Sequence, residues 1–208
     1  MTLFQLLLSG GFSMVILVLF SLVSIGVIIE RLRYYHRRSR TKRPDFSVSV
    51  KRELERGEVA HAMRLCETTD TPFAKVALAG LSLSGHPEKE VDNAMDRAII
   101  VETNLLERRT GIIGTIGSTA VYVGLLGTVL GILKAFMAIS STGTGGINVV
   151  SRGISESLVT TVAGLIVAVP AVMAYNYFLH RLSEFTADME LCASEVLDLM
   201  TGNYARKS

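Results

Sequence analysis

Two long apolar segments with almost no charge constrain the fold of this chain more than any other feature. They run from Gly114 to Ile139 and from Gly153 to Phe178, and each exceeds the roughly 20 residues that a helix needs to cross a bilayer. Glycine, alanine and hydroxyl residues recur in both at helical spacing. In lipid, helices associate through small side chains that allow close approach and through hydrogen bonds between helices. The two segments are therefore predicted to be tightly packed transmembrane helices.

A third apolar block covers residues 12–30, and a basic run follows it directly. No lysine or arginine precedes the block and no small-residue cleavage site closes it, so we expect a retained span rather than a signal peptide. Hydrophobic residues make up 49% of the 208 residues and are concentrated in these three blocks. The predicted fold class is an all-α membrane protein with three transmembrane helices, the second and third extended into a helical cytoplasmic stalk.

The basic run predicts the orientation of the chain in the membrane. It contains Arg31, Arg33, Arg37, Arg38, Arg40, Lys42 and Arg43. Basic residues next to a span mark the cytoplasmic side. We therefore expect an extracytoplasmic N-terminus at 1–11, transmembrane helices at 12–30, 111–139 and 153–179, a cytoplasmic helical loop at 31–110, an extracytoplasmic loop at 140–152 and a cytoplasmic tail at 180–208.

The cytoplasmic loop is expected to be helical. Apolar residues near helical spacing predict one helix from Val48 to Cys66, and Thr71-Pro72 supplies the cap and first-turn proline of the next. After the breaker at residues 85–87, no further breaker interrupts the pattern. A single long helix is therefore predicted from Pro87 to Ile139. The third span is likewise predicted to continue on one helical face to Met200.

The cysteines and histidines do not indicate a structural site. Cys66 and Cys192 both fall on the reducing side of the predicted topology, so no disulfide is expected. The four histidines share no ligand spacing, and no phosphate-loop, zinc-protease or serine-hydrolase motif occurs. We therefore expect no enzyme activity, no cofactor and no metal.

Small residues mark the faces by which the second and third spans pack. Gly117, Gly124 and Gly131 recur every seven residues and share one helical face, where another helix is expected to approach closely. The third span has a similar stripe at Ser157, Thr161, Gly164, Ala168 and Ala171. Pro170 frees a backbone carbonyl and permits a bend, or is only a tolerated kink. Two such stripes would line a narrow, weakly polar passage.

Three polar residues in these spans are candidate site residues. The hydroxyls of Thr128 and Thr161 need partners in a dry environment, either along a passage or at a carbonyl of their own helix. Glu156 is costly in hydrocarbon, so it is expected to face water, a cavity or a partner. An interfacial position at the outer mouth is its alternative role.

Two motifs contain these residues. The first is Gly124-Leu125-Leu126-Gly127-Thr128-Val129, and the second is Gly153-Ile154-Ser155-Glu156-Ser157-Leu158 with Thr161, Gly164 and Pro170 after it. Together they resemble the MotA/TolQ/ExbB proton-channel family, nearest to its ExbB and TolQ branch.

The resemblance implies a pentamer whose second and third spans surround a pore. A single-span partner of ExbD or TolR type would occupy the pore and carry the titrating aspartate. Thr128 and Thr161 match the pore-lining threonines of the family, and Glu156 matches its glutamate. The implied function is a proton-channel subunit of a motor complex that uses the proton motive force to energise an envelope-spanning TonB- or TolA-type protein. A gliding or rotary stator and a non-conducting membrane scaffold are the alternatives.

Overall fold

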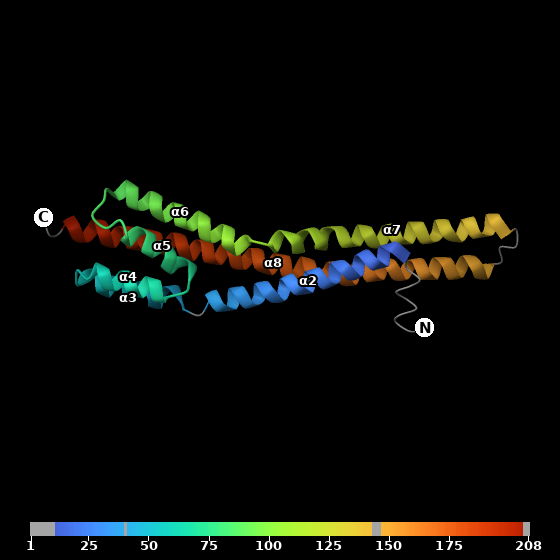
Figure 1. The fold of residues 1–208 in the computed structure, drawn as a ribbon, viewed down its shortest axis with the longest axis horizontal. Coiled ribbons are helices and arrows are strands. Elements are labelled where there is room, and N and C mark those ends of the chain that lie inside the picture. The colour runs from blue at the N-terminus through green and yellow to red at the C-terminus, as the bar shows by residue number, and fades with distance from the viewer. Residues whose placement is uncertain (1–10, 40, 143–146, 206–208) are drawn as a thin grey trace. The chain divides into compact units, whose positions relative to one another are not determined.

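The computed structural model describes residues 11–39, 41–142 and 147–205, which form helices without any strand (Figure 1). Residues 1–10 and the middle of the predicted 140–152 loop lie outside the described part. The described helices are α2 (Gly11–Arg38), α3 (Arg43–Glu55), α4 (Val59–Thr68), α5 (Pro72–Leu81), α6 (Glu88–Glu107), α7 (Thr110–Thr142) and α8 (Ile147–Ala205).

The chain divides into two compact units. The apolar unit contains Met1–Glu30 and Arg109–Tyr177, and the polar unit contains Arg31–Arg108 and Phe178–Ser208. Among the described helices, α2, α7 and α8 are long and apolar enough to cross a membrane. The predicted class, an all-α membrane protein with three spans, is therefore confirmed. The predicted continuation of the third span to Met200 is also confirmed, because α8 is one helix.

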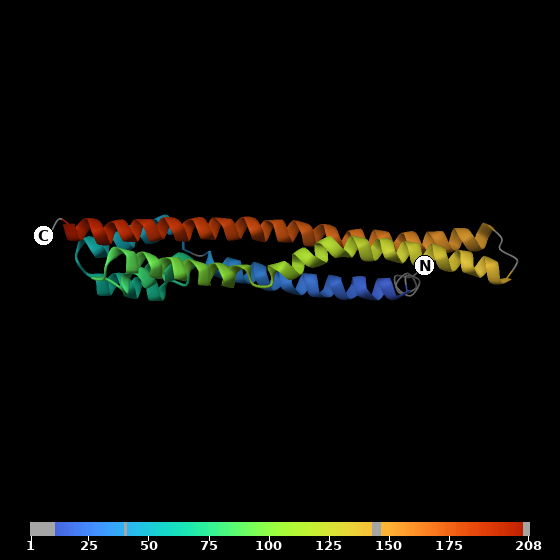
Figure 2. The same ribbon diagram turned by 90° about the horizontal axis from the view of Figure 1, so that it is seen from above.

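In the apolar unit, α2, α7 and the first part of α8 lie side by side (Figures 1 and 2). Leu17, Ala120 and Ala168 form the centre of their contact and are almost fully buried. Most of the large apolar side chains instead face outward; Ile166, for example, is 68% exposed. Such a distribution is unfavourable in water and favourable in lipid, where the surroundings are as apolar as the side chains.

In the polar unit, short helices pack around large side chains. The ring of Tyr35 stacks on that of Phe178 with 5.5 Å between centroids, and the Phe46 and Phe73 rings lie 5.1 Å apart. α5 begins at the predicted Thr71-Pro72 step. Seven of its ten residues are buried, so it forms the centre of this unit, with α4 and α6 in contact with it.

The predicted helix from Pro87 to Ile139 is wrong. α6 ends at Glu107 and α7 begins at Thr110, with Arg109 in the left-handed region at φ 67°. Side chains of α2 satisfy the carbonyls at the end of α6: Arg31 Nη1 donates to the oxygens of residues 105 and 106, at 3.3 and 3.2 Å, and Tyr35 Oη donates to that of Leu106 at 3.1 Å. Because these donors replace the next helical turn, the helix stops without glycine or proline.

The predicted helix from Val48 to Cys66 is also wrong, because two helices occupy this region. α3 ends at Glu55 and α4 begins at Val59. Gly57 between them has φ 77°, a conformation that glycine adopts without the steric cost that other residues incur. The helical spacing of the apolar residues continued across the break and concealed it.

Candidate functional site

Glycines bring α7 and α8 of the same chain into backbone contact. A Cβ atom placed on Gly124 would lie 3.0 Å from the Thr160 carbonyl oxygen, and one placed on Gly164 would lie 2.8 Å from the Ala120 oxygen. Both distances are shorter than van der Waals contact, and backbone atoms cannot rotate out of the way. Further along, Gly117 faces Val172 and Gly131 faces Ser157. The predicted glycine positions and the stripe on the third span therefore meet each other within one chain.

The two candidate threonines lie at this close approach. The Thr128 and Thr161 hydroxyls are hydrogen-bonded to each other. Each also lies within reach of the Gly124 carbonyl, at 3.2 Å from Thr128 Oγ1 and 3.3 Å from Thr161 Oγ1. A hydroxyl has one proton to donate. One threonine therefore donates to the other while the second donates to Gly124, and these two arrangements exchange by rotation of the hydroxyls.

The threonine pair remains partly exposed on the surface of the chain, whereas the neighbouring glycines are buried. Thr128 and Thr161 are half-buried, while Gly124 and Gly164 are buried. The sequence allowed two partners for the Thr128 hydroxyl: a group along a passage or a carbonyl of its own helix. The structure shows the second, the Gly124 carbonyl, and adds the contact with Thr161. Removing either hydroxyl would leave the other with the carbonyl as its acceptor.

Two buried hydroxyl residues beside Gly127 were not identified from the sequence. Thr160 is 1% exposed and Ser13 is 3% exposed, and both lie against Gly127. Gly127 is therefore a second point, besides the cluster of Leu17, Ala120 and Ala168, at which α2, α7 and α8 meet. Thr160 directly precedes Thr161, and Ser13 is a small polar residue in the first apolar block. Both positions could have marked these residues as candidates in the sequence. Their burial distinguishes them from the accessible threonine pair.

Glu156 and Pro170 lie apart from the threonine pair on α8. Glu156 is half-buried and precedes Thr161 by five residues, which corresponds to about 140° around the helix and about 7.5 Å along it. Pro170 is exposed, and α8 continues through it. Since proline has no N–H, the carbonyl of Ile166 has no donor four residues later.

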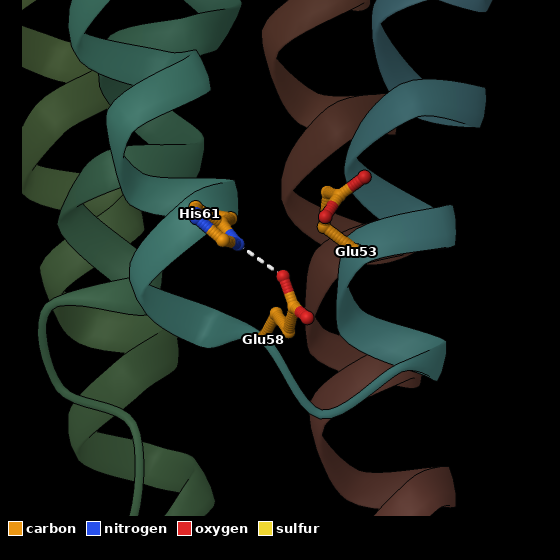
Figure 3. A group of neighbouring side chains, drawn as sticks. All are labelled: Glu53, Glu58 and His61. Atoms are coloured by element: carbon orange, nitrogen blue, oxygen red, sulfur yellow. Dashed lines mark hydrogen bonds and ion pairs between the residues drawn. The ribbon is translucent and has the colours of Figure 1, made fainter.

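One group of side chains in the described residues has the geometry of a metal site, and it lies in the polar unit. Figure 3 shows Glu53, Glu58 and His61, whose ligand atoms lie within 4.8 Å of one another. His61 pairs with Glu58, and Glu53 pairs with Arg56 at 3.6 Å. These are partly or fully exposed residues, and each glutamate already has a side-chain nitrogen as its neighbour, an arrangement that is common on protein surfaces. The histidine pattern in the sequence gave no indication of this group.

The fold and the site define a class of protein: an all-α membrane protein whose spanning helices pack through glycine and present paired hydroxyls. Residues 68–191 match the model of the MotA/TolQ/ExbB proton channel family, and the chain belongs to this family. The resemblance to its ExbB and TolQ branch is confirmed by the relatives that follow.

Several curated relatives carry the names of this branch. The chain is 34% identical over 152 residues to the biopolymer transport protein ExbB of Xanthomonas campestris pv. campestris (strain B100), covering 65% of this chain and 60% of the relative. It is 28% identical over 195 residues to ExbB of Salmonella typhimurium, covering 90% and 80%. It is 42% identical over 95 residues to the Tol-Pal system protein TolQ of Haemophilus influenzae, covering 46% and 42%. The chain thus spans less than two thirds of the length of the Xanthomonas relative.

Proposed function

We propose that this chain is the proton-channel subunit of an inner-membrane motor complex driven by the proton motive force. The threonine pair is the observation that carries the proposal. Its two hydroxyls exchange donor and acceptor roles with each other and with the Gly124 carbonyl. Because α7 and α8 seal against each other on either side of the pair, a passage would follow the face on which these hydroxyls stay accessible.

The proton acceptor of the motor is expected to come from a partner. Residues 111–139 contain no carboxylate, and residues 153–179 contain only Glu156. We therefore propose a single-span partner of ExbD or TolR type with a titrating aspartate, inside a homo-oligomer expected to be a pentamer. Each charge that crosses 100 mV provides about 2.3 kcal/mol. That energy would move the partner and, through it, an envelope-spanning TonB- or TolA-type protein.

The outward apolar faces of α7 and α8 support an assembly of this kind. Tyr122 and Phe136 on α7 are 69% and 58% exposed, and Met173 on α8 is 68% exposed. Such faces can be covered by lipid, by a second copy of the chain or by a partner helix, because each of these has an apolar surface. In this proposal Glu156 attracts cations at the outer end of the passage.

The proposed orientation places the N-terminus outside the cytoplasm and the basic run inside it. The reason is the charge asymmetry across the first span. Single cysteines at Thr2 and Ser39, on a background without the native cysteines, test this with an impermeant reagent added to intact cells. Thr2→Cys should be labelled and Ser39→Cys should not. The reverse pattern would place Glu156 at the cytoplasmic end and overturn its proposed role.

Substitution of Thr161 tests the proton pathway. Valine matches threonine in shape but has no hydroxyl, whereas serine keeps the hydroxyl and loses a methyl group. We expect Thr161→Val to lower partner-dependent proton flux at least tenfold while the complex still assembles, and Thr161→Ser to retain more flux than valine. Thr119→Val is the matched control, since its hydroxyl donates only to Thr115 of its own helix, at 2.7 Å.

The measurement is proton flux into vesicles, normalised to the amount of assembled complex. Parental flux in Thr161→Val, with lower flux in Thr161→Ser, would mean that Thr161 only fills space between α7 and α8. That order of fluxes would contradict a role of the Thr161 hydroxyl in proton passage and would favour a non-conducting scaffold.

A further inference from the structure

The structure divides the basic run after the first span into two groups. The first group turns into the polar unit and is paired there. Arg31 is 3% exposed and donates to carbonyls of α6. Arg38 pairs with Glu102 at 3.4 Å, and Arg43 with Asp188 at 3.1 Å. These arginines stabilise the polar unit, so their charge is not available to a ligand.

The second group lies on the opposite, exposed side of α2. Arg33 and Arg37 are exposed and four residues apart, which places them one above the other on the same helical face. None of the ion pairs found among the described residues involves either of them. Leu32, next to Arg33 in the chain, is 45% exposed. Two guanidinium groups therefore stand together at an apolar surface without a carboxylate partner.

The position of this face on α2 matches the headgroup layer. Arg33 follows the predicted end of the span at residue 30 by three residues, which is about 4.5 Å along the helix. The headgroup region extends roughly 5–7 Å beyond the hydrocarbon on each side. Helical side chains lean toward the N-terminus, so the side chain of Arg37 leans back toward the membrane as well. Ile29, one turn before Arg33 on the same helix, is 45% exposed and apolar.

We propose that Arg33 and Arg37 form a binding site for the headgroup phosphate of an anionic phospholipid, with acyl chains along the apolar residues that precede them on α2. Guanidinium groups bind phosphate oxygens in pairs and are more weakly hydrated than ammonium groups. Apolar surface on the span side and positive charge at headgroup level together fit an anionic lipid, and fit a free phosphate ion less well. The proposal needs only the membrane assignment and is independent of proton passage.

The absence of tryptophan from the chain allows a direct test. Ile29→Trp places one fluorescent reporter one turn before Arg33 on the face of α2 that carries both arginines. The full-length protein is reconstituted in equimolar mixtures of phosphatidylglycerol and phosphatidylcholine, with either lipid brominated to quench tryptophan. We expect brominated phosphatidylglycerol to quench more strongly. Arg33→Gln with Arg37→Gln should lower this preference by about fivefold for each arginine, since each contributes about 1 kcal/mol near an anionic surface.

The control removes the same charge elsewhere. Arg52 on α3 and Arg64 on α4 are exposed, and Arg52→Gln with Arg64→Gln in the reporter background should leave the preference unchanged. Equal quenching by both lipids in the parent, or an equal fall in the control, would overturn the proposal. Relief of quenching by soluble glycerol phosphate would assign the site to free phosphate instead. A changed oligomer mass in the Arg33/Arg37 variant, with lipid preference unchanged, would assign the face to a second copy.

Discussion

The two units of this chain are held together by opposite means. In the apolar unit the closest contacts occur at Gly124 and Gly164, where the lack of a side chain lets the two backbones approach each other. In the polar unit they depend on large or charged side chains, such as Tyr35 on Phe178 and Arg38 on Glu102. Burial of apolar surface stabilises a unit surrounded by water. It offers little in lipid, where close backbone contact must replace it.

The largest effect is expected from removing the buried charge of the polar unit. Glu102 is 4% exposed and pairs with Arg38 and with Lys75, at 3.4 and 3.2 Å. Glu102→Ala leaves Arg38 partly uncompensated in a buried site, and we expect a loss of about 3 kcal/mol. Hydrogen exchange of α6 amides measures this loss. Exposed Asp96 on the same helix provides the control, Asp96→Ala, which should have little effect.

The same experiment tests whether the two units are stabilised separately. Amides of α7 between residues 111 and 139 should keep their protection in Glu102→Ala. A loss of protection as large in α7 as in α6 would contradict the comparison between the units.

A smaller effect is expected from adding one methyl group at the glycine contacts. Gly164→Ala presses against backbone atoms of α7 and should cost about 1–3 kcal/mol. In the polar unit a Cβ atom on Gly80 meets the Sδ atom of Met95 at 2.6 Å, but a methionine side chain can move aside. Gly80→Ala should therefore cost less than about 1 kcal/mol, part of which the better helix propensity of alanine offsets.

Thermal unfolding in nanodiscs compares these variants. Gly26→Ala is the control within the apolar unit, because nothing lies within 4 Å of its added carbon. An equal cost for Gly80→Ala and Gly164→Ala would show that the units tolerate added volume alike.

The hydroxyl of Tyr35 should contribute about 1 kcal/mol to the free energy of unfolding of the polar unit, and this contribution should depend on pH. Its hydroxyl donates to the Leu106 carbonyl, a bond that Tyr35→Phe removes. Burial raises the pKa of Tyr35 from its ordinary value of about 10 to about 12. The folded state therefore favours the neutral phenol, and the stability is present below pH 10 and lost as the pH rises toward 12. Alkaline titration of α6 hydrogen exchange should show a weaker pH dependence in Tyr35→Phe; an unchanged profile would contradict the role of burial.

The smallest effect concerns reactivity rather than stability. Burial raises the pKa of the Cys66 and Cys192 thiols to about 12. The thiolate is the reactive form, so maleimide at pH 8 should label either cysteine only when the polar unit opens. Ser39→Cys, at an exposed position, should be labelled much faster. Equal rates would mean that the polar unit is open in solution.

The sequence predicted the elements better than their ends. The Thr71-Pro72 start of α5 and the continuity of α8 followed from local signals. The break at Gly57 had a local signal as well, but the helical spacing around it concealed that signal. The break before Arg109 had none, because its cause is Arg31 and Tyr35, more than 70 residues earlier.

The candidate site was predicted in the same uneven way. The family motifs identified Thr128 and Thr161 as residues to consider, while their mutual hydrogen bond joins positions 33 apart. Buried Thr160 looked no different in sequence from its neighbour Thr161, because their exposure depends on which side of α8 faces α7.

The sequence by itself determined the three apolar helices and the family, because length, hydropathy and short motifs are properties of continuous segments. The tertiary structure decided which arginines of the basic run turn inward and that the glycine stripes of α7 and α8 meet each other. It also decided where α6 ends. These outcomes depend on contacts between distant residues, such as Arg43 with Asp188, 145 positions apart. The sequence around either residue does not show such a contact, because it does not reveal which side of the helix will face the distant partner.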